Sequence, residues 1–283
     1  MIGELFERRG ASRRSLSPAT VRVGQALYYG AIAVSLTILL APIVIVVGIA
    51  FNPTQREAFP PTGVSLHWFR EFFLSEQFFP AFVFVSLPIA VVTGVLATTL
   101  GVMAAYVLVR RDVPFENAAQ SMLLGPLIVP AVIIGLGLLL FFAQLRLNVP
   151  VVDIVVGHTV ITLPYTLLTS MTRLYNIDPA LEEASRNLGA SKVETFRRVT
   201  LPLMRSGVIA GFLFAFIISF ADINIALFLA GDDVVTLPLA IFLFLEWESS
   251  PIIAAISTLQ ILLIMVMVLL IGRLVGFEAF TTR

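Results

Sequence analysis

The sequence predicts an all-α, polytopic membrane protein with six transmembrane helices. Of the 283 residues, 58% are hydrophobic and only 13% are charged, whereas soluble globular domains are about 45–50% apolar and about 25% charged. A helix needs about 20 mainly apolar residues to cross the hydrocarbon core of a bilayer. Six stretches meet this length without the in–out alternation of barrel strands, and they span residues 27–51, 80–109, 121–142, 152–171, 207–230 and 251–272.

The composition also excludes several functional classes. The net charge is zero, with 18 basic and 18 acidic residues, so no basic surface for nucleic acid is expected. The absence of cysteine removes disulfides, thiolate catalysis and Cys-ligated metal centres. The two histidines, His67 and His158, do not form a metal-binding His-Glu-x-x-His helix. We therefore assign no catalytic residue, no metal ligand and no cofactor.

The first apolar stretch is expected to remain in the protein as a span. Its length exceeds the roughly 7–15 residues of a signal-peptide core, and no small-residue cleavage site follows it. Residues 1–26 are basic and polar, and we expect them to form a loosely ordered cytoplasmic tail. The sequence thus divides into this tail, a transmembrane unit of residues 27–272 and a C-terminal tail of residues 273–283.

The distribution of basic residues predicts which side each connection faces. If the N-terminus lies inside, only Arg56, Arg70 and Arg146 fall in outer connections, and the other basic residues are inside. Because cytoplasmic loops carry the excess of Lys and Arg, both termini are predicted to be cytoplasmic.

Aromatic residues and prolines mark local features of this arrangement. In the outer connection at 52–79, Trp68-Phe69 and Phe72-Phe73 favour a short helix at the membrane interface. The alternative is a docking surface for an external partner. Prolines within spans often kink the helix, and five are found there: Pro42, Pro88, Pro126, Pro130 and Pro164.

The cytoplasmic connection at 172–206 is more polar than the rest of the chain. Asp178 is a good N-cap, and Pro179 suits the first helical position, where its missing N–H costs nothing. Glu182 and Glu183 then fall in the early turns, where the positive end of the helix dipole favours acids. These residues predict a short polar helix.

A second short helix is expected after a glycine break. Gly189 supplies the left-handed conformation that commonly ends a helix. Ser191 and Glu194 have the spacing of a capping box, and the second helix is expected to stop at Pro202.

Leu181, Ala184 and Leu188 give the first of these helices a narrow apolar stripe. Helices this short need something to pack against. The pattern fits a docking element, and the alternative is a connector that lies on the lipid headgroups.

The spacing of this connection resembles the EAA loop of permease subunits in binding-protein-dependent ABC importers. The family pattern is E-A-A, three residues, G, nine residues and then I-x-L-P. This chain has Glu183-Ala184-Ser185, Gly189 and Val199-Thr200-Leu201-Pro202 at the same spacing. Serine replaces the second alanine, and valine replaces the isoleucine. Segments 124–130, 219–222 and 236–238 are also similar to spermidine/putrescine-type permeases, and the resemblance covers about residues 25–272.

The resemblance implies that the loop couples the spans to a separate ATP-binding subunit. By it, the first helix sits in a cleft of that subunit, Glu183 contacts the subunit, Gly189 sets the bend, and Pro202 fixes how the loop enters the fifth span. The coupling residues so implied are Glu182, Glu183, Ala184, Ser185, Gly189, Leu201 and Pro202.

The same resemblance implies the partners and the location. The partners are two copies of an ATP-binding cassette subunit, a second and related permease subunit, and an extracytoplasmic solute-binding protein, in the bacterial inner membrane. The only lysine, Lys192, is not part of a phosphate-binding loop, so the ATPase is expected to be another polypeptide. A small polar solute is the implied substrate, with polyamines first.

Asp222, with Asn224 nearby, is the main candidate for the substrate pathway. It lies 15 residues into the expected fifth span, and ionisable groups inside a membrane are costly and usually functional. It is predicted either to line the pathway for a cation or to form an interhelical hydrogen bond. Asp153 and His158 are expected at the membrane interface rather than buried.

An acidic outer loop is expected after the fifth span. It contains Asp232, Asp233, Glu246 and Glu248 and has no basic residue. It suits a basic partner or a cation, and the alternative is a solvated loop.

Two other functional classes compete with the importer. An ion-gradient-driven secondary transporter is expected to have more intramembrane carboxylates or paired discontinuous helices. An intramembrane enzyme or a structural anchor leaves the loop spacing unexplained.

Overall fold

The structure is a computed structural model that describes residues 18–112, 114–231 and 233–275. Within these residues the regular secondary structure is helical, apart from one isolated bridge between Gly231 and Val234, and turns and loops join the helices. Four helices are long and apolar enough to cross a membrane, and two bent helix pairs bring the number to as many as six. The predicted all-α class is therefore confirmed.

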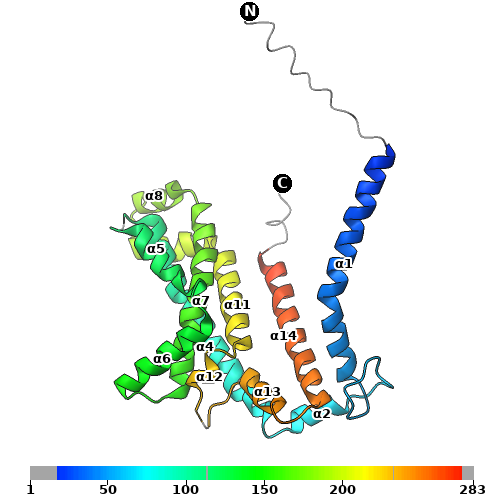
Figure 1. The fold of residues 1–283 in the computed structure, drawn as a ribbon. Coiled ribbons are helices and arrows are strands. Elements are labelled where there is room, and N and C mark those ends of the chain that lie inside the picture. Colours follow the sequence, from blue (N-terminus) through cyan, green and yellow to red (C-terminus); the bar gives the residue numbers. More distant parts are fainter. Residues whose placement is uncertain (1–17, 113, 232, 276–283) are drawn as a thin grey trace, which may run out of the picture.

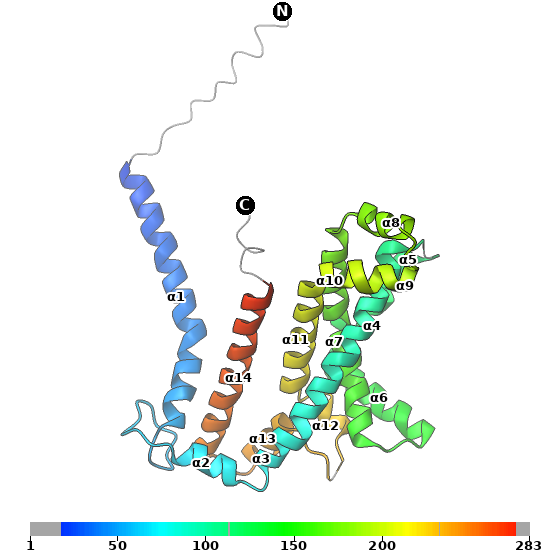
Figure 2. The same cartoon turned by 180° about the vertical axis from the view of Figure 1, so that it is seen from behind.

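The first and last long helices pair with each other beside the rest of the bundle. α1 (Pro18–Ala50) and α14 (Pro251–Val275) lie next to each other and stand apart from α4 and α7 (Figures 1 and 2). α1 begins at Pro18, so the expectation of a loosely ordered tail is wrong for residues 18–26. Residues 1–17 and 276–283 lie outside the described part of the chain.

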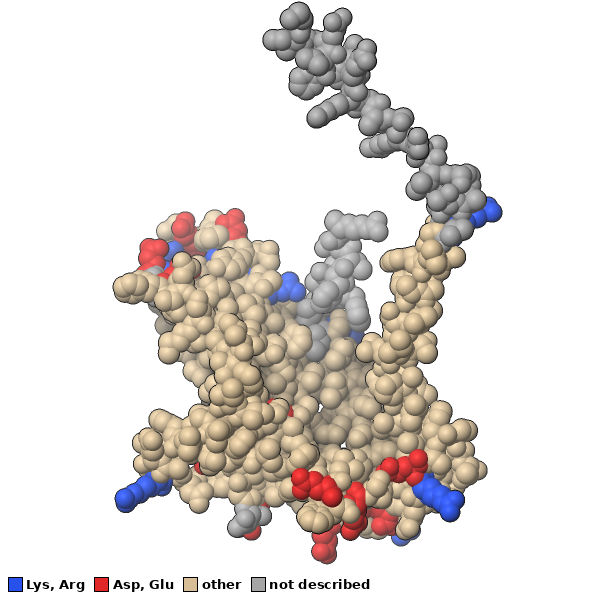
Figure 3. Space-filling model, viewed as in Figure 1, with Lys and Arg blue, Asp and Glu red and all other residues tan. Residues whose placement is uncertain are grey.

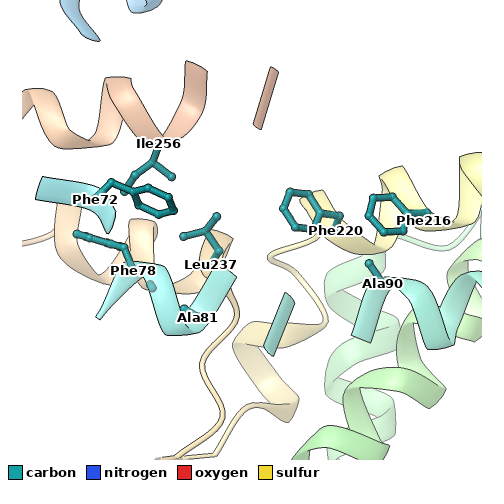
Figure 4. Close-up of a cluster of buried hydrophobic side chains, with 9 residues drawn as sticks. Phe72, Phe78, Ala81, Ala90, Phe216, Phe220, Leu237 and Ile256 are labelled. Carbon is teal, nitrogen blue, oxygen red and sulfur yellow. The ribbon is translucent and has the colours of Figure 1, made fainter. Parts of the chain in front are cut away.

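The predicted outer helix is present as α2 (His67–Leu74), but it turns two of its aromatic side chains into the protein. Trp68 is buried, and its indole Nε1 donates a hydrogen bond of 2.8 Å to the carbonyl of Asn52. Phe72 is also buried, in the cluster with Phe78, Leu237 and Ile256 (Figure 4). α2 thus fastens the outer connection to the bundle, whereas Phe73 of the same helix is exposed.

Three membrane-spanning segments form the centre of the bundle. α3 (Phe78–Pro80), the π-helix η2 (Ala81–Ser86) and α4 (Leu87–Arg110) run on as one span. This span packs against α7 (Pro150–Tyr175) and α11 (Arg205–Ala221).

Close approach of α4 and α7 depends on one glycine. A Cβ at Gly101 would lie 2.9 Å from the backbone nitrogen of Leu167. Nearby, Thr166 Oγ1 donates a 2.7 Å hydrogen bond to the carbonyl of Ala97 on the opposite helix. Small residues and interhelical hydrogen bonds are the usual means of helix association in membranes.

The third apolar stretch is not the single straight span that its composition predicts. α5 (Glu116–Leu124) and the short 3-10 helix η3 (Gly125–Leu127) meet α6 (Ala131–Leu145) at 102°. Pro130, in an extended conformation, precedes α6. Proline has no N–H and its ring clashes with the preceding turn, so it favours a break at this position.

The fifth stretch also differs from its prediction. After α8 (Pro179–Asn187), the segments α9 (Lys192–Thr195), η4 (Phe196–Thr200) and α10 (Leu201–Leu203) lead into α11 with a bend of 74°. The helix passes through Pro202, and the bend follows at Met204, which lies outside helical geometry. The expected stop at Pro202 is therefore wrong.

α11 ends at Ala221 rather than at residue 230, because the chain becomes extended at Asp222. It resumes as α12 (Ala226–Leu229). The outer loop that follows contains a further helix, α13 (Leu237–Leu245), whose first N–H donates a 2.7 Å hydrogen bond to Ser86 Oγ.

The two ends of the bundle differ in the elements they carry. The start of α1, the end of α14 and the helix α8 lie at one end, and α2, α12 and α13 lie at the other (Figures 1 and 2). Acidic side chains gather at the second end near α2 and α13 (Figure 3). Along the chain, Glu71 lies in α2 and Glu76 follows it, Asp233 precedes α13, and Glu246 and Glu248 follow α13. Asp232 lies outside the described residues.

Candidate functional site

The caps of the polar connection and the break at Gly189 form as the sequence predicts. Asp178 caps α8, because its carboxylate accepts a 2.9 Å hydrogen bond from the N–H of Ala180. Gly189 ends the helix with a φ of +95°. Both halves of the capping box are formed: the N–H of Ser191 donates to Glu194 at 3.0 Å, and the N–H of Glu194 donates to Ser191 Oγ at 3.3 Å.

The capping box lowers the pKa of its acidic residue, Glu194. The backbone N–H of Ser191 holds the pKa of Glu194 below its ordinary value, with smaller contributions from the Ser191 hydroxyl and the charge of Arg198. Glu194 is therefore ionised at neutral pH, and its carboxylate remains an acceptor at the start of α9.

One side of α8 is open to the surroundings. Leu188 is 90% exposed, Leu181 is 49% exposed, and Val193 at the start of the next helix is 67% exposed. Glu183 and Ala184 are exposed as well. The predicted apolar stripe therefore lacks a cover from the described residues of this chain.

The opposite side of α8 faces the bundle through Glu182. This side chain is buried, and its Oε1 accepts a 3.1 Å bond from Arg110 Nε at the end of α4. The same oxygen accepts a 3.1 Å bond from Thr200 Oγ1 at the end of η4. The two adjacent glutamates, Glu182 and Glu183, thus have different surroundings although they are the same residue type.

Arg110 also binds the end of α7. Its Nη2 donates to the carbonyls of Leu174 at 3.0 Å and Ile177 at 2.8 Å. Basic side chains at a helix C-terminus satisfy the last carbonyls and favour the negative end of the helix dipole. In the sequence Arg110 stands out only as an inner basic residue, and no local pattern links it to Glu182, 72 residues away.

The remaining residues of the motif hold the connection together. Ser185 Oγ and Thr195 Oγ1 are 3.2 Å apart, which joins α8 to α9. Leu201 packs against the buried cluster around Leu174 and Met204. Pro202 is exposed in the first turn of α10.

The candidate pathway residues lie at the opposite end of α11. Asp222 immediately follows Ala221, the last residue of that helix. Its Oδ1 accepts a 2.7 Å bond from the N–H of Ile225 and lies 3.4 Å from His158 Nε2 on α7. Asp222 is therefore not inside a continuous helix, and its carboxylate caps the break in the chain and lies close to a neighbouring helix. Asn224 is half-buried in the same break.

The expectation that Asp153 and His158 lie at the membrane interface is wrong, because both are buried in the protein. His158 Nδ1 is 2.7 Å from Ser219 Oγ on α11. Asp153 accepts a 3.2 Å bond from the N–H of Val149 at the start of α7. Across residues 18–275, within the described ranges, no three histidine or carboxylate side chains gather as a metal-ligand set.

The comparisons with known proteins agree with this architecture. Residues 97–277 match the family described as "binding-protein-dependent transport system inner membrane component", a range that includes α8 and its connections. The chain belongs to this family. It is a multi-pass permease subunit of an ABC importer in the inner membrane.

Named relatives of this permease cover most of its length. It is 30% identical over 82% of the chain to the spermidine/putrescine transport system permease protein PotC of Haemophilus influenzae, and the match covers 90% of that protein. It is 33% identical over 79% of the chain to the putrescine transport system permease protein PotI of Escherichia coli, and this match covers 81% of the relative.

Solved structures share the fold of the permease. A bacterial ABC transporter involved in the import of the acidic polysaccharide alginate matches with a TM-score of 0.68 at 13% identity. That match covers 90% of this chain and 97% of the other. The MetNI methionine ABC transporter matches with a TM-score of 0.57 at 17% identity, over 74% of this chain and all of the other.

Proposed function

We propose that this permease forms half of the pathway for a polyamine and is driven by a separate ATP-binding subunit that docks on α8. The exposed side of α8 supports the docking, because its apolar residues lie in the segment that carries the family's loop spacing. The relatives named for spermidine and putrescine transport support a polyamine as the solute.

The proposed orientation places α8 and both termini in the cytoplasm. Among the described residues, the end that holds α8 carries most of the arginines and the only lysine. The opposite end carries Arg56, Arg70 and Arg146. This asymmetry follows the preference of cytoplasmic loops for basic residues.

Docking is assigned to the exposed residues Leu181, Glu183, Ala184 and Leu188, with Gly189 setting the bend behind them. An apolar side chain that is fully exposed on one subunit stabilises an interface when the partner covers it. Two copies of the ATP-binding subunit, a second related permease and an extracytoplasmic solute-binding protein complete the assembly. ATP hydrolysis belongs to the ATP-binding subunit, since this chain has no phosphate-binding loop.

The substrate pathway is assigned to the break that follows α11. Asp222 supplies a negative charge suited to a polyamine, and Asn224 supplies a neutral polar group next to it. The hydrogen bond from the N–H of Ile225 holds the carboxylate of Asp222 in place at this break, where it lies 3.4 Å from His158 Nε2.

A single substitution tests the docking. Leu188→Glu should release the ATP-binding subunit from the purified complex and abolish uptake of putrescine, because a charge replaces an apolar contact. Val64→Glu is the matched control, since Val64 is 85% exposed in the connection at the other end. Retention of the ATP-binding subunit by the Leu188→Glu complex would contradict the docking surface.

A further inference from the structure

Three separate segments meet at the guanidinium group of Arg110. It belongs to the last residue of α4, and it binds Glu182 of α8 and the carbonyls of Leu174 and Ile177 at the end of α7. Thr200 of η4 binds the same carboxylate oxygen. A buried charge is tolerated only when it is paired and its hydrogen bonds are satisfied. This cluster meets that condition, and we refer to Arg110, Glu182 and Thr200 as the joint.

α8 has few other attachments among the described residues. It is nine residues long, which is too short to be stable without packing. Its outward side is exposed, and its other side-chain bond to a neighbouring element is that between Ser185 and Thr195. Short connections that contain Asp178 and Gly189 precede and follow it. Glu182 is therefore the point at which α8 is fastened to the membrane-spanning helices.

Each partner of Glu182 belongs to a segment that continues into a membrane-spanning helix. Arg110 ends a 33-residue span that reaches the opposite end of the bundle, a length of about 50 Å at 1.5 Å per residue. Thr200 closes the π-helix that leads to α11, and π-helices often occur at functional sites. A movement of α8 thus reaches α4, α7 and α11 through hydrogen-bonded side chains, in addition to the backbone on either side of α8.

We propose that the joint transmits the movement of the ATP-binding subunit from α8 to the spans, and that Arg110 is its central positioning residue. This inference rests on the proposed docking of that subunit on α8. The two roles are separate on the helix: Glu183 and Leu188 face outward to the partner, whereas Glu182 faces inward to Arg110. Loss of the joint therefore leaves the docking surface in place and uncouples it from the spans.

Three variants weaken the joint in different ways. Arg110→Lys keeps the charge, but a single ammonium group cannot reproduce the planar fork of arginine. Glu182→Gln keeps the size and removes the charge. Thr200→Val removes only one hydroxyl, so it is the mildest change.

Two controls have the same chemistry outside the joint. Arg111→Lys changes the exposed arginine next to Arg110. Thr172→Val removes an exposed hydroxyl that donates to the carbonyl of Leu168 in its own helix, at 2.8 Å. Neither control alters a bond between α8 and the spans.

The test measures distances in the purified complex of permeases, ATP-binding subunits and binding protein. The chain has no cysteine, so spin labels at Asn187→Cys on α8 and Met103→Cys on α4 report one distance. Both positions are exposed. The distance is recorded with and without a non-hydrolysable ATP analogue, together with the amount of bound ATP-binding subunit, the thermal stability of the complex and putrescine uptake.

With the joint intact and in both controls, α8 and α4 move together, and the label distance stays single and narrow in both states. In Arg110→Lys and Glu182→Gln the distribution should broaden when the nucleotide binds. Uptake should fall about tenfold, as expected for the loss of one charge-assisted hydrogen bond. The ATP-binding subunit should remain bound. Thr200→Val should also broaden the distance distribution, with a smaller loss of uptake. If Arg110→Lys or Glu182→Gln fails to assemble, the result for Thr200→Val decides whether the joint transmits the movement.

A narrow distance in both states for Arg110→Lys and Glu182→Gln would overturn the joint. A loss of thermal stability without any broadening of the distance would also overturn it, because the bonds of the joint would then only stabilise the fold. Failure of the docking proposal gives a different result, since the Leu188→Glu complex would then keep its ATP-binding subunit.

Discussion

Gly101→Ala should separate α4 from α7 and destabilise the permease. The new Cβ would lie 2.8 Å from Thr166 Cβ and 2.9 Å from the backbone nitrogen of Leu167. A backbone atom cannot swing away as a flexible side chain does, so the two helices must move apart. Overpacking of this kind costs about 1–3 kcal/mol. The shift also strains the bond from Thr166 to Ala97, and interhelical hydrogen bonds in membranes contribute about 0.6 kcal/mol on average.

A total of about 2 kcal/mol corresponds to a fall of roughly 4–8 °C in the midpoint of thermal unfolding. The assay is thermal unfolding of the purified permease in detergent. Gly137→Ala is the matched control, because a Cβ there meets no atom of the described chain within 4 Å. Alanine is also the better helix former, by about 0.5–1 kcal/mol. If Gly101→Ala unfolds at the same temperature as Gly137→Ala, the close packing of α4 on α7 does not have the energetic role assigned to it.

Two further predictions concern the connection at α8. Gly189→Ala should weaken the end of α8 by about 1 kcal/mol and lower uptake, because a φ of +95° disfavours a Cβ although the space around it is open. Gly189→Asn should stay closer to the original activity, since asparagine tolerates the left-handed region, and equal uptake by the two variants would refute the conformational reason. The bond from Ser191 holds the pKa of Glu194 below its ordinary value. The ionised carboxylate therefore stabilises the folded protein fully above the ordinary glutamate pKa. This stabilisation is lost as the pH falls through the lowered pKa. The thermal midpoint of Glu194→Gln should therefore lie below that of the unchanged protein at pH 7 and approach it in acid, and a constant difference across this range would contradict the assignment.

Features that depend on neighbouring residues along the chain could be predicted from the sequence. Long apolar stretches predict helices because lipid offers no hydrogen-bond partner to an open backbone. The caps at Asp178 and Ser191, and the break at Gly189, follow from side-chain and backbone chemistry within a few residues. The loop spacing from Glu183 to Pro202 identifies the family without any structure.

Bends and breaks were less predictable, because their outcome depends on packing as well as on local chemistry. Prolines lie in several of the apolar stretches. The stretch with Pro130 breaks by 102°, whereas α7 continues through Pro164. Hydropathy also extends the fifth span beyond Asp222, where the chain in fact leaves the helix to bond with Ile225 and approach His158.

The sequence by itself determined that this protein is a helical membrane permease with a polar connection of two short helices. Only the tertiary structure decided which residues of that connection face inward. Glu182 and Glu183 are adjacent and chemically equivalent in the sequence, yet one binds Arg110 and Thr200 while the other is exposed. The physical reason is distance along the chain: Arg110 lies 72 residues from Glu182, and only the packing of α4 against α7 brings the two charges together.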